Sequence, residues 1–155
     1  MDIVDQATRS RMMASIRGVN TKPEMIVRRE LHALGFRYRI HVRELSGRPD
    51  IVLAKFKAVV FVNGCFWHAH EGCELFKVPS TRTEFWREKL LANRRRDERN
   101  VFQLQEDGWR VATVWECSLN QDKSAAEKLA NWLYSLSRQI ELPELNRQAS
   151  SGIAQ

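Results

Sequence analysis

The chain has 155 residues, which is enough for one domain with a sizeable buried core. Its hydrophobic content of 43% is that of a globular chain, and no apolar run approaches the ~20 residues of a membrane span. The first residues have neither the basic nor the apolar segment of a secretory signal, and three cysteines cannot all pair internally. We therefore expect an intracellular protein that is not built on disulfides.

The net charge of +6 and the isoelectric point of about 9.6 favour a polyanionic partner such as nucleic acid, although some globular proteins are merely basic. Residues 1–48 contain ten Lys or Arg against five Asp or Glu, whereas the rest contains fifteen against fourteen. The N-terminal third is therefore expected to form part of the binding surface.

Hydrophobic periodicity predicts two helices and a strand in the first third. A short helix over residues 8–17 mixes arginines with methionines, which suits either a DNA contact or a solvated surface helix. A second helix begins at Thr21, where Thr21 and Glu24 have the spacing of a capping box, and it ends at Gly35. Residues 36–43 then alternate between apolar and basic, which predicts a half-buried strand.

Strands and helices interleave in the remainder. We expect a hairpin of strands over 50–54 and 58–62, a long basic helix over 81–106, a strand over 109–115 and an amphipathic helix from 124 to about 140. This order predicts an α/β fold with a central mixed sheet flanked by helices. One domain would span residues 1–140, with an N-terminal DNA-contacting arm over 1–20 and a disordered tail over 141–155.

Metal ligands are concentrated between residues 63 and 73. Cys65, His70 and Cys73, together with Cys117 after the later strand, make one Cys₃His set, which is typical of a closed structural zinc site. Buried free cysteines are the alternative. His68 competes with His70 as the fourth ligand, and the histidine left over is available for chemistry.

A second group of residues suggests hydrolysis. Asp50 begins a strand, and the hairpin should place Val62 and Asn63 beside it, so Asp50 and a main-chain carbonyl can hold Mg²⁺. His68 can reach the same place as a general base. Glu24 is either an outer-sphere ligand or only the capping-box residue, and Asp50 can also be an ordinary residue at the start of a strand.

Aromatic residues accompany both groups. Phe66 and Trp67 lie on the loop between the metal ligands, and Trp86 lies in the first turn of the basic helix. Aromatic rings beside cations can stack on bases or wedge between them, whereas Trp86 can equally belong to the core.

Several motifs in order resemble those of the very-short-patch-repair (Vsr) DNA mismatch endonucleases of bacteria, over about 110 residues. The motifs are Gly47-Arg48-Pro49-Asp50, Asn63-Gly64-Cys65-Phe66-Trp67-His68, Phe76-Lys77-Val78-Pro79, Thr81-Arg82-Thr83-Glu84-Phe85-Trp86, and Gly108-Trp109-Arg110-Val111 leading to Trp115-Glu116-Cys117. The resemblance implies a restriction-endonuclease-like fold. It also implies a Mg²⁺-dependent nick 5′ to the thymine of a T·G mismatch, which arises when 5-methylcytosine deaminates.

The resemblance also implies roles for single residues. Asp50 and the main chain of Val62 would hold Mg²⁺, and His68 would be the general base. The active site would further contain Glu24, Asn63 and Asp97. The structural zinc would be bound by Cys65, His70, Cys73 and Cys117. The residues that would enter or face the mismatch are Phe66, Trp67, Trp86, Met13, Lys89 and Asn93.

The chain departs from the family in three places. Asn63 stands where a well-known member of the family has a histidine, the loop from His70 to Cys73 is one residue longer, and the Asp/Glu-x-Lys part of the wider nuclease motif is absent. A catalytically silent, zinc-stabilised DNA-binding module is the alternative function. The expected partner is double-stranded DNA with a T·G mismatch, with mismatch-repair proteins as further partners. We expect a monomer in the bacterial cytoplasm, at the nucleoid.

Overall fold

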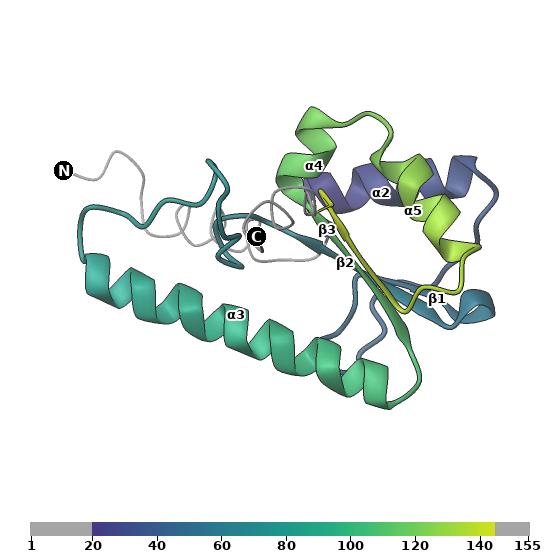
Figure 1. Cartoon of the computed structure of the whole chain (residues 1–155), viewed down its shortest axis with the longest axis horizontal. Coiled ribbons are helices and arrows are strands. Elements are labelled where there is room, and N and C mark those ends of the chain that lie inside the picture. Colours follow the sequence, from purple (N-terminus) through teal and green to yellow (C-terminus); the bar gives the residue numbers. More distant parts are fainter. Residues whose placement is uncertain (1–19, 145–155) are drawn as a thin grey trace, which may run out of the picture.

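A mixed sheet of four strands lies at the centre of the fold, in the order β1-β2-β3-β4 (Figure 1). The computed structural model describes residues 20–144. The helix expected over residues 8–17, with Met13, therefore lies outside the described residues, as do residues 145–155 of the expected tail.

The sheet combines a hairpin with two parallel crossovers. Strands β1 (Ile51–Leu53) and β2 (Ala58–Asn63) pair antiparallel through the short 3₁₀ turn η1 (Ala54–Phe56). Strand β3 (Arg110–Trp115) runs parallel to β2, and β4 (Gln139–Leu142) runs parallel to β3. Because β2 and β3 are parallel, the residues that follow them emerge at the same end of the sheet.

Helices cover both faces of the sheet (Figure 1). Helices α2 (Lys22–Ala33), α4 (Glu116–Gln121) and α5 (Ala125–Leu133) lie on one side, and the long helix α3 (Thr83–Glu106) lies on the other. Alternate residues of β2 pack against opposite helical layers. Val60 packs in the core cluster that includes residues of α2 and α5, whereas Val59 packs with Leu104 of α3. The predicted mixed sheet flanked by helices is thus confirmed. Among the described residues, no helix is long and apolar enough to cross a membrane.

Two expected elements are corrected. Residues 36–43 do not form a strand, because only Arg39 pairs with Val52, and His41 has a φ of +57° that interrupts an extended run. The last helix ends at Leu133 rather than near residue 140. Ser135 donates its hydroxyl to the Trp132 carbonyl at 2.7 Å, and such a local bond favours a turn over a further helical turn.

The C-terminal boundary also shifts. Residues expected to end the helix and begin the disordered tail instead form β4, which pairs Glu141 with Thr113 and Leu142 with Val114. Leu142 is fully buried in the core cluster. The folded unit therefore extends past the boundary expected at residue 140.

Candidate active site and metal centre

Asp50 lies immediately before β1 and turns its carboxylate toward β2. The Val62 backbone N–H donates to Oδ2 of Asp50 at 2.7 Å. The preceding turn is held against α3 at Gly47, which has a φ of +74° and where an added Cβ would lie 2.9 Å from the Cβ of Asn100. Only glycine combines this conformation with so close an approach, so Gly47 fixes where the Asp50 carboxylate emerges.

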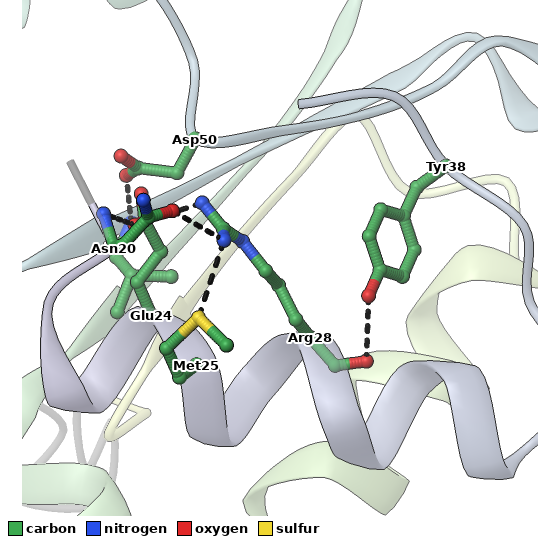
Figure 2. A network of polar contacts seen from close by, with 7 residues as sticks. Asn20, Glu24, Met25, Arg28, Tyr38 and Asp50 are labelled. Atoms are coloured by element: carbon green, nitrogen blue, oxygen red, sulfur yellow. Dashed lines mark hydrogen bonds and ion pairs between the residues drawn. The ribbon is translucent and has the colours of Figure 1, made fainter. Parts of the chain in front are cut away.

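A buried polar network from α2 surrounds this carboxylate (Figure 2). Glu24 is only 3% exposed; it accepts from the backbone N–H of Asn20, and its Oε2 lies 2.9 Å from Nη2 of Arg28. Arg28 donates to the side-chain oxygen of Asn20 at 2.7 Å, and the Tyr38 hydroxyl donates to the Arg28 carbonyl at 3.0 Å. Arg28 thus neutralises one carboxylate and ties it to the helix start.

The capping box expected at the start of α2 is not formed. Thr21 makes no side-chain capping bond, and the Glu24 carboxylate is directed toward Asn20, Arg28 and Asp50 instead. The interpretation of Glu24 as a capping-box residue is therefore wrong. Its carboxylate belongs to the Asp50 site.

The two carboxyl groups form a site of hard oxygen donors. Burial raises the pKa of Asp50 well above its usual value, and a hydrogen bond with Glu24 raises it further, while the Val62 N–H acts in the opposite direction. Two adjacent buried carboxyl groups resist ionising together, and among the described residues Arg28 makes an ion pair with Glu24 alone, so the charge of Asp50 is left for a further cation. The donor set therefore fits a divalent oxygen-binding cation such as Mg²⁺.

His68 and Asp97 form the second part of the cleft. Nδ1 of His68 lies 2.5 Å from Oδ2 of Asp97, which projects from α3. With Nδ1 engaged, Nε2 is the nitrogen available to accept a proton. This is the geometry of a general base held in one tautomer by a carboxylate.

A cleft of about 760 Å³ joins these groups. Its lining includes nine residues expected from the sequence to be functional, namely Glu24, Asp50, Asn63, Phe66, Trp67, His68, Lys89, Asn93 and Asp97, together with Val62. The sequence reasoning missed Arg48 and Arg96, two cations on the same lining. Arg48 belongs to the Gly47-Arg48-Pro49-Asp50 motif and Arg96 to the basic residues of α3, but nothing in the sequence distinguishes either from a solvated charge.

Three aromatic rings form a cluster at the cleft. The ring centroids of Phe66 and Trp67 are 5.0 Å apart, and Trp86 lies 5.9 Å and 6.0 Å from them. Asn93 donates to the Trp67 carbonyl at 3.2 Å, and the ammonium of Lys89 lies 5.6 Å from the Trp86 ring. Trp86 thus belongs to this half-buried cluster and not to the main core clusters.

The predicted thiol and imidazole ligands also meet. The ligand atoms of Cys65, His70, Cys73 and Cys117 all lie within 4.8 Å of one another, and Sγ of Cys117 is 3.5 Å from Nδ1 of His70. Burial raises the pKa of the Cys65 and Cys117 thiols. A cation at this point would favour the thiolates, and the soft tetrahedral donor set fits zinc.

Ala69 separates the two histidines. It is buried and has a φ of +53°, so the chain reverses between His68 and His70. His68 consequently faces Asp97, whereas His70 joins the cysteines. The alternative that His68 is the fourth thiol-cluster ligand does not fit this arrangement.

The carboxylates, imidazole and cations on one cleft are groups that nucleases use on phosphodiesters. A sequence model described as DNA mismatch endonuclease Vsr matches residues 1–75. The DNA mismatch endonuclease Vsr of Escherichia coli is 44% identical over 137 residues, which cover 85% of this chain and 87% of that protein.

Two nicking enzymes are similarly close. The type II nicking enzyme V.XorIIP of Xanthomonas oryzae is 42% identical over 132 residues, covering 85% of this chain and 96% of that protein. The type II nicking enzyme V.NmeAIP of Neisseria meningitidis is 43% identical over 128 residues, covering 83% and 91%. The chain belongs to the Vsr family of DNA mismatch endonucleases.

Proposed function

We propose that this protein is a Mg²⁺-dependent endonuclease that nicks one DNA strand 5′ to the thymine of a T·G mismatch left by deamination of 5-methylcytosine. The observation that carries the proposal is the meeting of the Asp50–Glu24 carboxyl pair and the His68–Asp97 pair on one cleft beside the aromatic cluster. The DNA-cleaving relatives support the same activity.

Each polar residue then has a role. Asp50 and the main chain of Val62 hold Mg²⁺, with Glu24 in its outer sphere. Bound Mg²⁺ supplies Lewis-acid stabilisation of charge that develops on the phosphate. His68 accepts the proton of the attacking water at Nε2, while Asp97 holds the ring and stabilises its charged form. Asn63, on the same lining, contacts the phosphate.

Recognition of the mismatch falls to the aromatic side of the cleft. Phe66, Trp67 and Trp86 intercalate beside the mismatched pair, which Lys89 and Asn93 face. Met13 acts from the opposite groove.

The Cys65, His70, Cys73 and Cys117 cluster binds a structural zinc that stiffens the loop bearing Phe66, Trp67 and His68. The fold is then of the restriction-endonuclease type. The protein acts as a monomer on chromosomal DNA in the cytoplasm at the nucleoid, and it meets mismatch-repair proteins there.

The test is a nicking assay on duplexes that carry T·G, other mismatches or only paired bases, with Mg²⁺ and with EDTA. We expect one nick, in the thymine strand of T·G only, and only with Mg²⁺. Asp50→Ala should abolish it, while Asp107→Asn, an exposed carboxylate at the end of α3, should cut like the parent.

Two results separate the proposal from the silent DNA-binding module. Tight T·G binding without any cleavage under all metal conditions would favour the module. Equal nicking by Asp50→Ala and the parent chain would reject Asp50 as the metal ligand.

A further inference from the structure

The indole of Trp115 connects parts of the site that no role yet explains. Its ring stacks on the imidazole of His70, with centroids 4.0 Å apart and planes inclined by only 7°. The same indole meets the ring of His68 at a centroid distance of 6.5 Å with an inclination of 74°. Trp115 therefore lies between the candidate metal ligand and the candidate base.

Trp115 is itself anchored to the neighbouring strand. Its Nε1–H donates to Oε1 of Glu141 at 2.6 Å, and only 8% of the residue is exposed. Glu141 belongs to β4, the strand that the sequence patterns did not reveal. Trp115 ends β3 opposite Asn63, and Cys117 follows two residues later. The sheet therefore fixes the indole beside the loop.

A ligand imidazole needs such support. Its nitrogen lone pair lies in the ring plane, so rotation about the Cβ–Cγ bond moves the lone pair away from the metal. Ligand histidines usually donate their other N–H to a carboxylate or carbonyl, which prevents this rotation. Among residues 20–144, His70 makes no such bond at Nε2, whereas its ring lies flat against the indole of Trp115.

We propose that Trp115, anchored by Glu141, is a positioning residue that fixes the ring plane of His70 for zinc and holds His68 in register with Asp97. This inference rests on the zinc centre proposed above. Trp115 does not touch substrate; it acts through the two histidines. It also links the zinc centre to β4, so the sheet edge contributes to the metal site.

Variants of Trp115 and Glu141 distinguish a role in orienting the histidines from a role in packing alone. Trp115→Phe retains an aromatic face and loses the N–H donor, whereas Trp115→Leu retains an apolar side chain of smaller volume and loses the face. Glu141→Leu removes the acceptor, and Glu141→Gln preserves one. Trp132→Leu is the matched control, because Trp132 is equally buried but packs in the main core beside Arg110, away from the thiol cluster.

The experiment measures zinc content, and then the rate of zinc release to an excess of a coloured chelator, on the full chain far below its melting temperature. We expect about one zinc per parent chain and release at least ~10-fold faster from Trp115→Leu. Glu141→Gln should stay within about 3-fold of the parent, with Trp115→Phe and Glu141→Leu between the two groups. Trp132→Leu should lower the melting temperature without changing the release rate.

Zinc-loaded chains then give a second measurement. Trp115→Leu should lower kcat for nicking with little change in KM, because His68 loses its position while the DNA contacts remain. Equal zinc release from the parent and Trp115→Leu, or equally fast release from Trp132→Leu, would overturn the positioning role alone. A parent chain that binds no zinc would overturn the metal centre, and this inference with it.

Discussion

At the scale of single residues, the backbone conformation of Ala69 determines where the side chains of His68 and His70 point. An L-residue in the left-handed region costs about 1–2 kcal/mol, and here that cost is offset by burial of the methyl group and by the bonds around it. His70 donates its backbone N–H to the Cys65 carbonyl at 2.9 Å, and His68 donates to that of Gly64 at 3.2 Å. These bonds close the loop only if residue 69 reverses it.

The effect of substituting Ala69 on stability should therefore depend on the shape of the new side chain. Ala69→Val should destabilise the protein by about 2 kcal/mol or more, because a branched side chain is disfavoured at this φ and has no room. Ala69→Gly should change stability by less than ~1 kcal/mol, since relief of the backbone offsets the lost methyl group. Urea unfolding measures both, and equal effects of Val and Gly would contradict the argument.

Asp97 should matter for the rate and not for binding. Asp97→Asn keeps the size of the side chain but removes the charge that holds Nδ1 of His68. We expect nicking to slow by ~10–100-fold, and His68→Ala to slow it by about 10²–10⁴-fold. Single-turnover kinetics with saturating DNA measures both, and a fall in DNA affinity without a fall in rate would indicate a binding role.

At the scale of elements, periodicity predicted most of the architecture. The hairpin of β1 and β2, the long helix α3 and strand β3 lie where alternation and capping signals placed them, within a few residues. The strand expected over residues 36–43 failed because β1 has only three residues and offers little to pair with. Strand β4 was missed because Ile140 also fits the 3.6-residue period of the preceding helix.

The candidate site was predictable in composition but not in geometry. Cysteine and histidine spacing pointed to the thiol cluster, and the hairpin pointed to Val62 beside Asp50. Spacing could not choose between His68 and His70, because the answer depends on the φ of Ala69. Nor could it reveal Arg28 beneath Glu24, since a buried arginine on a helix has the same signature as a solvated one.

Strand β4 allows a direct test of where the folded unit ends. A chain that stops after residue 138 lacks the whole strand, exposes β3 and loses the buried Leu142. Loss of Leu142 alone should cost ~2–5 kcal/mol, so this chain should be largely unfolded. A chain that stops after residue 144 should melt like the full chain. Circular dichroism melting of the two compares them, and cooperative melting of the shorter chain would show that β4 is dispensable.

At the scale of the whole molecule, charged side chains of both signs gather on the cleft that we propose binds DNA. Arg48, Lys89 and Arg96 line the same cleft as the carboxyl groups of Asp50 and Glu24. With DNA in the cleft, the cations would offset the repulsion between these acids and the phosphates, and binding would release counterions from the DNA. The cleft lies at the end of the sheet where β2 and β3 finish. The candidate catalytic groups and the cations that would attract DNA therefore lie at the same end of the molecule.

This arrangement predicts that the salt dependence of DNA affinity comes from the cations of the cleft. Arg96→Gln should weaken DNA binding for matched and mismatched duplexes alike, and it should reduce the slope of log affinity against log salt by about 1. Arg138→Gln, an exposed arginine at the opposite end of the sheet, should leave the slope unchanged. Titration at several salt concentrations provides the slopes. A loss confined to T·G duplexes would instead make Arg96 a reader of the mismatch.

The reversal at Ala69 also dictates where this loop tolerates a change in length. Between Cys65 and His70 the side chains alternate among the thiol cluster, the aromatic cluster and Asp97, so one inserted or deleted residue would disrupt the partners of the two histidines. Beyond His70, Glu71 is exposed, and a Cβ at Gly72 would meet nothing within 4 Å. A residue added between His70 and Cys73 would therefore fall in a part of the loop that can absorb it without moving His68.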